Sequence, residues 1–228
     1  MKKYSFILML TVIYTVNLPA QKYEANWESI DSRPTPQWFA DAKFGIFIHW
    51  GVYSVPAWST RPSDGARGGD CFAESYWIQL MNPKRINPAF KAFHNKTYGE
   101  GVKYQDFVKD FTCEMFNPDD WVNLFHEAGA RYVVLTSKHA EGFALWPSAL
   151  AWNWNAVDVG PHRDLVGDLS DAVKKKGLHM GLYYSFYEWF NPLYHDNLEK
   201  YVDDRFFCCH KCSRCWQILW LEISNLPL

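Results

Sequence analysis

Apolar residues in the middle of the chain form short continuous runs separated by amphipathic stretches. Residues 132–135 (Tyr-Val-Val-Leu) and 180–184 (Met-Gly-Leu-Tyr-Tyr) have strand length, and residues 44–48 (Phe-Gly-Ile-Phe-Ile) form an earlier run. A run without polar alternation is typical of a strand that is buried on both faces, as in a parallel sheet. The pattern therefore predicts three strands of one parallel sheet at these positions.

An amphipathic helix is predicted directly before residues 132–135, after the long excursion that follows residues 44–48. Asn117 can cap its start, Pro118 suits its first position, and Gly129 provides its end. The spacing predicts an apolar face made of Trp121, Leu124, Phe125 and Ala128.

A second amphipathic helix is predicted before the last strand. Asp164 can cap its start, and three lysines followed by Gly177 mark its end. The order of strand, long excursion, helix, strand, loop, helix and strand predicts an α/β fold with a parallel sheet, either open or closed into a barrel. The apolar face of this helix is expected to contain Leu165, Val166, Leu169, Ala172 and Val173.

Residues 52–116 interrupt this rhythm and are rich in glycine, proline and aromatic residues. Ser63-Asp64-Gly65 and Gly68-Gly69-Asp70 are turn signals within them. Long segments between regular elements are often functional, so we predict a long loop on the side where a β/α fold builds its active site.

The N-terminal residues 1–20 are typical of a cleaved secretory signal peptide, with two lysines, an apolar stretch and a small residue at the end. The apolar stretch is shorter than the roughly 20 residues that span a bilayer, and no later segment is long enough, so no membrane partner is expected. The alternative is an uncleaved anchor. Entry into the secretory pathway would make Asn95, in Asn95-Lys96-Thr97, a candidate glycosylation site.

Composition excludes some classes of function. The net charge of −2, from 23 basic and 25 acidic residues, provides no basic surface for nucleic acid. The 48% of hydrophobic residues indicates a globular protein, and the 18% of aromatic residues suits cores, interfaces and sugar-binding platforms alike. The sequence contains no nucleophile elbow, phosphate loop or dinucleotide fingerprint, and its histidine spacing is not that of a metalloprotease, so no metal or cofactor is expected.

Polar side chains follow each of the three predicted strands. His49 comes after the first, Ser137-Lys138-His139 after the second and Tyr183-Tyr184-Ser185 after the third. The carboxyl ends of parallel strands meet at one edge, so these groups are expected to form one site, although each taken alone has a structural role as its alternative. Groups suited to holding a sugar are His49, Trp50, Trp58, Glu74, Trp77, His139 and Tyr183.

Several blocks of the sequence resemble the α-L-fucosidases, glycoside hydrolase family 29. Residues 38–51 (WFADAKFGIFIHWG) resemble the opening strand of that family, residues 117–139 its second unit, and residues 160–166 and 181–185 its third. The resemblance spans residues 25–205. It implies a retaining exo-glycosidase, secreted or lysosomal, that removes terminal α-L-fucose on a (β/α)₈ TIM-type barrel followed by a β-sandwich. It implies no cofactor.

The resemblance also assigns residues to the site. Two positions depart from the family pattern: Ala140 stands where a second histidine is usual, and Ser75 stands where an aromatic residue is usual. Each departure removes a contact worth about 0.5–1.5 kcal/mol, so weaker fucose binding or an altered substrate is expected. The residues that resemble the family's fucose-binding set are His49, Glu74, His139 and Tyr183.

The matching blocks account for about three of the eight β/α units of such a barrel, and the resemblance ends near Phe206. In this family the nucleophilic aspartate follows the fourth strand and the acid/base lies further on, so no catalytic residue is expected in this chain. We expect a signal peptide (1–20), a truncated and inactive catalytic barrel (21–206) and a Cys-rich tail (207–228). Three strands leave open sheet edges, so the isolated chain is expected to be largely insoluble.

The tail contains four of the six cysteines. Its alternatives are a splice variant or frame shift, an extension linked by disulfides to Cys71 or Cys113, and a metal site at Cys212-x-x-Cys215. The partners implied by the resemblance are fucosylated glycans or glycoproteins, with a homo-oligomer left open. The alternative functions are a non-catalytic fucose-binding protein and a protein that interacts with complete fucosidase subunits.

Overall fold

The computed structural model describes residues 24, 26–61, 71–81, 87–186 and 188–189. The predicted signal peptide and the Cys-rich tail lie outside these residues. The chain divides into two compact units, Met1–Asp41 and Ala42–Leu228. In the first unit, α1 (Trp27–Asp31) begins after Asn26, whose side chain accepts a hydrogen bond from the Ser29 N–H. Helix α2 (Gln37–Ala42) follows at the boundary between the units.

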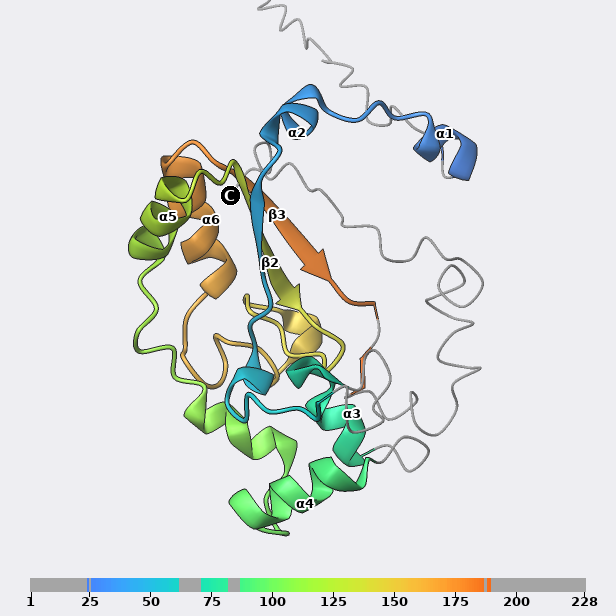
Figure 1. The fold of residues 1–228 in the computed structure, drawn as a ribbon, viewed down its shortest axis with the longest axis vertical. Helices are drawn as coiled ribbons and strands as arrows, with labels where there is room; N and C mark the ends of the chain where they lie inside the picture. The colour runs from blue at the N-terminus through green and yellow to red at the C-terminus, as the bar shows by residue number, and fades with distance from the viewer. Residues whose placement is uncertain (1–23, 25, 62–70, 82–86, 187, 190–228) are drawn as a thin grey trace, which may run out of the picture. The chain divides into compact units, whose positions relative to one another are not determined.

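The second unit is built on a parallel sheet whose described strands are β1 (Gly45–Ile48), β2 (Tyr132–Lys138) and β3 (His179–Tyr184), in that order. Gly45 lies opposite Tyr132, and Tyr132 lies opposite His179, so the three strands are in register and their carboxyl ends share one edge (Figure 1). The three predicted strands and the α/β class are therefore confirmed. The incomplete eight-stranded barrel stays a prediction.

Two helices connect the strands and lie side by side against one face of the sheet (Figure 1). Helix α5 (Pro118–Glu127) begins after Asn117, whose side chain accepts hydrogen bonds from two backbone N–H groups. Helix α6 (Leu165–Lys175) begins after Asp164, which accepts the Gly167 N–H at 2.8 Å. Gly129 and Gly177 follow the two helices with φ of +88° and +76°, a conformation that favours glycine. Both predicted helices and their caps are confirmed.

The apolar face predicted for α5 is wrong in part. Leu124 is 64% exposed and Ala128 is also exposed, whereas Val122 is fully buried beside the half-buried Trp121 and Phe125. The Trp121 ring packs against a cluster of aromatic rings from outside the helix, at centroid distances of 4.9–5.0 Å. These contacts, which come from distant sequence, decide which side of α5 is buried. The apolar face predicted for α6 is confirmed.

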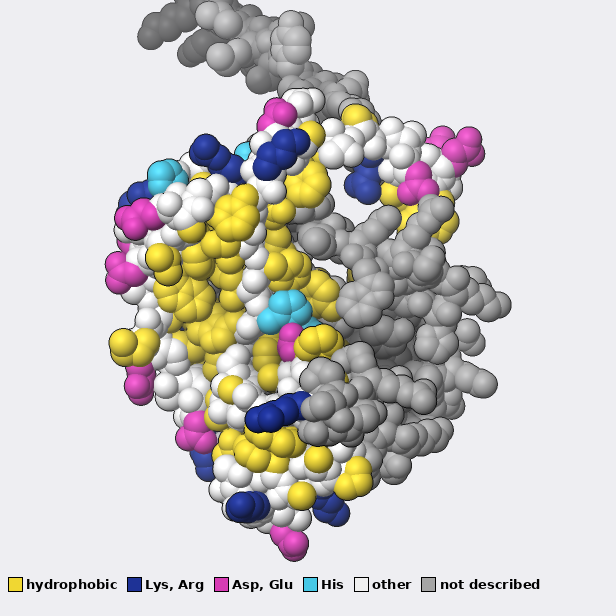
Figure 2. Space-filling view, in the orientation of Figure 1, with side chains coloured by type: hydrophobic (Ala, Val, Ile, Leu, Met, Phe, Trp, Pro, Cys, Tyr) yellow, Lys and Arg dark blue, Asp and Glu magenta, His cyan; other side chains and the backbone are white. Residues whose placement is uncertain are grey.

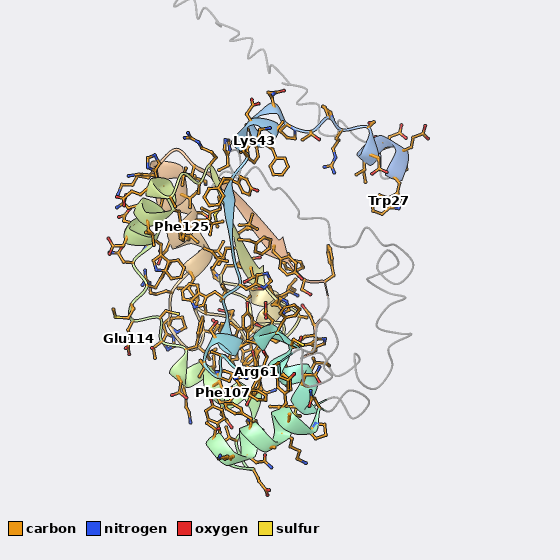
Figure 3. All side chains as sticks on the ribbon, viewed as in Figure 1. Trp27, Lys43, Arg61, Phe107, Glu114 and Phe125 are labelled. Atoms are coloured by element: carbon orange, nitrogen blue, oxygen red, sulfur yellow. The ribbon has the colours of Figure 1, made fainter. Side chains whose placement is uncertain are left out.

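The segment between β1 and β2, predicted as a long loop, is largely helical where it is described. Its own aromatic residues form a core, in which Tyr76, Phe90 and Phe107 are buried, and these rings hold the short helices together. The labelled Phe107 lies among tightly packed side chains in Figure 3. The turn signals at 63–65 and 68–70 lie outside the described residues. The elements are η1 (Val52–Ser54), η4 (Ala73–Ser75), α3 (Tyr76–Met81), α4 (Pro88–Thr97) and η5 (Tyr104–Asp110).

These elements lie at the carboxyl edge of the sheet, as predicted for the excursion (Figure 1). The loop after β2 contributes a further short helix, η6 (Ala149–Ala151), and returns to α6. The carboxyl ends of β1, β2 and β3 therefore face a helical layer (Figure 1).

Candidate functional site

The structure brings the four predicted site residues together at the carboxyl edge of the sheet. His49 follows β1, His139 follows β2, Tyr183 is near the end of β3, and Glu74 lies in η4. The rings of the first three are 5.8–6.2 Å apart between centroids, and His49 Nδ1 lies 2.6 Å from Glu74 Oε1. Figure 2 shows histidine and carboxylate side chains next to each other at the surface here, below a band of apolar side chains.

The His49–Glu74 pair is open to solvent on the histidine side. The two side chains are 43% and 18% exposed. The hydrogen bond from His49 lowers the pKa of Glu74, and it outweighs the effect of partial burial, which acts in the opposite direction. Glu74 is therefore an ionised carboxylate at neutral pH, which can accept hydrogen bonds from hydroxyl groups.

A second histidine–carboxyl pair, His139 and Glu141, lies deeper. Their side chains are 16% and 1% exposed, and His139 Nδ1 is 3.7 Å from Glu141 Oε2. Burial lowers the pKa of His139 to about 4 and raises the pKa of Glu141 to about 8. Both groups are therefore neutral between these values. The sequence predicted His139 as a site residue and gave no signal for Glu141.

Tyr183 completes the set from β3. Burial raises the pKa of its phenol, so the hydroxyl group keeps its proton and can both donate and accept hydrogen bonds. Ser137 donates a hydrogen bond of 2.8 Å to the carbonyl of Tyr183, which ties β3 to β2 beside the site. The adjacent Tyr184 instead contacts Lys138, whose Nζ lies 4.4 Å from the centre of its ring.

The three tryptophans named as groups suited to holding a sugar pack with the aromatic core: Trp77 is buried, and Trp50 and Trp58 are partly buried against it. Trp50 packs on Phe116 and Trp121, Trp58 stacks on an aromatic ring of α4, and Trp77 stacks on Tyr104. Trp50 follows His49 directly, so the two side chains leave the strand on opposite faces.

The aromatic ring that reaches the site is Phe47, which the sequence interpretation missed. It is 41% exposed and stacks on His49 at 5.0 Å. Its position two residues before His49 in a strand was the available signal, since such residues share a face. Trp189, whose ring centroid is 6.2 Å from that of His139, was also missed. No sequence pattern predicts that this residue lies near the site.

Metal and disulfide sites receive no support from the described part of the chain. It contains no group of three or more histidine, cysteine or acidic side chains that could hold a metal ion. The two cysteines that are described, Cys71 and Cys113, are not joined to each other. No helix among the described residues is long and apolar enough to cross a membrane.

The protein is of the α/β class, with a parallel sheet whose strands are joined through helices. Histidine, glutamate and tyrosine side chains gather at the C-terminal ends of its strands, where β/α folds build their sites. The chain belongs to the α-L-fucosidase family, whose model, described as alpha-L-fucosidase, matches residues 10–214. The resemblance stated above is therefore confirmed.

Relatives and solved structures agree with this assignment. Alpha-L-fucosidase of Dictyostelium discoideum is 49% identical over 189 residues, which are 82% of this chain and 39% of that protein. Human tissue alpha-L-fucosidase is 49% identical over 176 residues, which are 77% and 34%. The structure of Thermotoga maritima alpha-fucosidase with a mechanism-based inhibitor matches with a TM-score of 0.67 and 40% identity, over 80% of this chain and 45% of that one. The chain thus spans less than half the length of these relatives.

Proposed function

We propose that this chain forms the fucose-binding part of an α-L-fucosidase, an enzyme that hydrolyses terminal α-L-fucose from glycoconjugates with retention of configuration. The observation that carries the proposal is the convergence of four side chains at one edge of the sheet. They are His49, Glu74, His139 and Tyr183.

The geometry suits a sugar with several hydroxyl groups and an apolar face. Ionised Glu74 accepts hydrogen bonds from hydroxyl groups, and Tyr183 both donates and accepts them. Because the His49 Nδ1–H donates to Glu74, the Nε2 atom of His49 is left for the ligand. The exposed ring of Phe47 provides an apolar surface for sugar C–H groups.

The bond-breaking carboxylates are proposed to lie outside the described residues. A retaining glycosidase uses two carboxyl groups about 5–5.5 Å apart, one as the nucleophile and one as the acid/base. Glu74 is bonded to His49, and the Glu141 side chain is only 1% exposed, so these two groups do not supply that pair. We therefore expect residues 1–228 alone to bind fucose without hydrolysing fucosides.

The cellular setting follows from the same proposal. The relatives include tissue and plasma α-L-fucosidases, which supports a secreted or lysosomal protein. Residues 1–20 would act as the signal peptide that directs it to the secretory pathway. Asn95 would carry a glycan there. It lies near the end of α4 and donates a hydrogen bond to the exposed Glu100 at 3.3 Å, so it is at the surface. The substrates would be fucosylated glycans or glycoproteins.

The test is a calorimetric titration of the soluble fraction of the purified full chain with L-fucose, with D-fucose as the mirror-image control. Tyr183→Phe removes a hydroxyl contact and should weaken L-fucose binding about tenfold, whereas the neighbouring Tyr184→Phe should leave it unchanged. Circular dichroism checks that each variant is folded. A folded chain that does not bind L-fucose, or binds both sugars equally, contradicts the proposal.

A further inference from the structure

The buried carboxyl group of Glu141 has no role in the binding set described above, yet it faces that set directly. Its Oε2 atom and the Nδ1 atom of His139 are both buried, and neither has a hydrogen-bond partner in the described part of the chain. The two atoms lie 3.7 Å apart. Buried polar atoms without partners are rare in folded proteins, so two that face each other call for an explanation.

Contacts to the backbone and to the carboxyl group of Glu141 fix the position of its side chain. The Trp154 indole N–H donates to the Glu141 carbonyl at 3.1 Å. The backbone of Gly51 approaches Oε1 so closely that a side-chain carbon at position 51 would lie 3.2 Å from it. The carboxyl group is therefore confined between the loop after β1 and the loop after β2, with its Oε2 toward His139.

A separation of 3.7 Å is too long for a hydrogen bond, and a shift of about 1 Å would form one. The ring of His139 packs on Tyr183 and Tyr53 at centroid distances of 5.8 and 5.7 Å, and these contacts hold it beside Glu141.

We propose that Glu141 is a positioning residue for His139: its carboxyl group donates a hydrogen bond to Nδ1 and so makes Nε2–H the face that His139 presents to the sugar. This inference rests on the proposed fucose site. It assigns the orientation of one binding residue to a neighbour that does not touch the ligand.

The surroundings of the pair keep a proton available for this hydrogen bond. Burial raises the pKa of Glu141 to about 8, and the negative charge of Glu74 acts in the same direction. Lys138 and the backbone N–H of Glu141 act in the opposite direction without overcoming burial. The titratable groups facing the pair from the packed elements are Tyr53 of η1, Glu74 of η4, Tyr104 of η5, Lys138 of β2, Tyr183 of β3 and His49 after β1.

Two variants separate positioning from simple packing. Glu141→Gln keeps the shape and a neutral donor for Nδ1, whereas Glu141→Met fills the space and donates nothing. We expect Glu141→Gln to bind L-fucose within about twofold of wild type, and Glu141→Met to bind about tenfold more weakly. Above pH 8 wild type should also lose affinity as Glu141 loses its proton, and Glu141→Gln should not.

The decisive readout is the tautomer of His139, read from the ¹⁵N chemical shifts of its two ring nitrogens at pH 6.5 in the full chain without sugar. The Nε2–H form is expected in wild type and Glu141→Gln, and a mixture of tautomers in Glu141→Met. An Nδ1–H form in wild type overturns the proposal, even if Glu141→Met does not fold. The same tautomer in all three chains also overturns it. If wild type fails to bind L-fucose, the proposed function fails, and the tautomer still decides the role of Glu141.

Discussion

Two histidine–carboxyl pairs lie within one site and have opposite electrostatic character. His49 and Glu74 meet at 2.6 Å with His49 open to solvent, and Glu74 has a lowered pKa. His139 and Glu141 lie 3.7 Å apart out of water, where burial shifts both pKa values toward the neutral forms. The same two side-chain types therefore provide an ionised acceptor at the rim and a neutral pair behind it.

The difference teaches that the balance between desolvation and a short hydrogen bond, and not the identity of the partner residue, decides the charge state of the carboxyl group in such a pair. At the rim the hydrogen bond from His49 outweighs partial burial, so the charged carboxylate is favoured. In the interior the backbone hydrogen bond of Glu141 does not compensate for the loss of water, and its Oε2 has no partner among the described residues, so the neutral carboxylic acid is favoured.

Breaking the rim pair should have the largest effect. Glu74→Ala removes a charged acceptor, and a hydrogen bond to a charged group is worth about 1.5–3 kcal/mol, so L-fucose affinity should fall roughly 10- to 150-fold. The measurement is a calorimetric titration. Glu127→Ala, which removes an exposed carboxylate at the end of α5, is the matched control and should change nothing. Equal affinities for the two variants would contradict the assignment of Glu74.

The interior pair should be visible in the pH dependence of stability. Glu141 has a folded pKa of about 8 against 4.5 for an ordinary glutamate, so the folded chain binds the extra proton and the free energy of unfolding falls as pH rises between these values. His139 contributes the opposite slope from pH 4 to 6.5. Only the Glu141 slope remains above pH 6.5, at up to about 1.4 kcal/mol per pH unit.

Urea unfolding at pH 6.5 and 8 measures this slope. Wild type should lose about 2 kcal/mol more than Glu141→Gln across that interval, because the amide does not titrate. Parallel pH profiles for the two chains would show that Glu141 is already ionised at pH 6.5.

A third change affects the interior pair indirectly. Lys138 is 3% exposed and its Nζ lies 2.5 Å from an oxygen of Glu188, which is 38% exposed. Glu188→Gln leaves the ammonium group buried without its counter-charge, and we expect the free energy of unfolding to fall by about 1–2 kcal/mol, less than for a fully buried pair. The pKa of Glu141 should fall as well, because the charge of Lys138 is then no longer balanced.

The matched control breaks an exposed ion pair of the same kind. Asp119→Asn removes the partner of Lys175, whose side chain is 73% exposed, and should cost less than about 0.5 kcal/mol. Chemical denaturation compares the two variants. A Glu188→Gln chain as stable as Asp119→Asn would refute the importance of burial for Lys138.

The smallest expected effect concerns the departure from the family pattern beside His139. Ala140→His restores the usual second histidine and should raise L-fucose affinity several-fold, as one added hydrogen bond of about 0.5–1.5 kcal/mol would. Ala140 is buried, and its carbonyl accepts the Trp189 N–H at 2.7 Å, so the melting temperature must be recorded too. A folded variant with no gain in affinity would remove the idea that this position weakens fucose binding.

The sequence was sufficient for features that depend on local chemistry. Asn117 and Asp164 cap their helices because their side chains reach nearby backbone N–H groups, and the strands follow from continuous apolar runs. The convergence of His49, His139 and Tyr183 was also predictable, since aligned parallel strands bring their carboxyl ends to one edge.

Features that depend on packing between distant segments could not be predicted. The burial of Trp50 and the exposure of Leu124 depend on aromatic rings that other segments bring against β1 and α5. The neutral state of Glu141 depends on η1 and η5, which shield it from water. Both elements lie far from Glu141 in the sequence, about 30 to 90 residues before it. No local pattern reports such desolvation.

The central claim is that a short hydrogen bond keeps Glu74 charged while burial keeps Glu141 neutral. It is tested most directly by the ¹³C chemical shifts of the two carboxyl groups between pH 3 and 9. The full chain is labelled at the glutamate side-chain carboxyl carbons, and Glu74→Gln and Glu141→Gln assign the two signals. The account predicts that Glu74 titrates below pH 4.5 and that Glu141 titrates with a midpoint near 8. A Glu141 midpoint near 4.5, beside that of an ordinary glutamate, would contradict it.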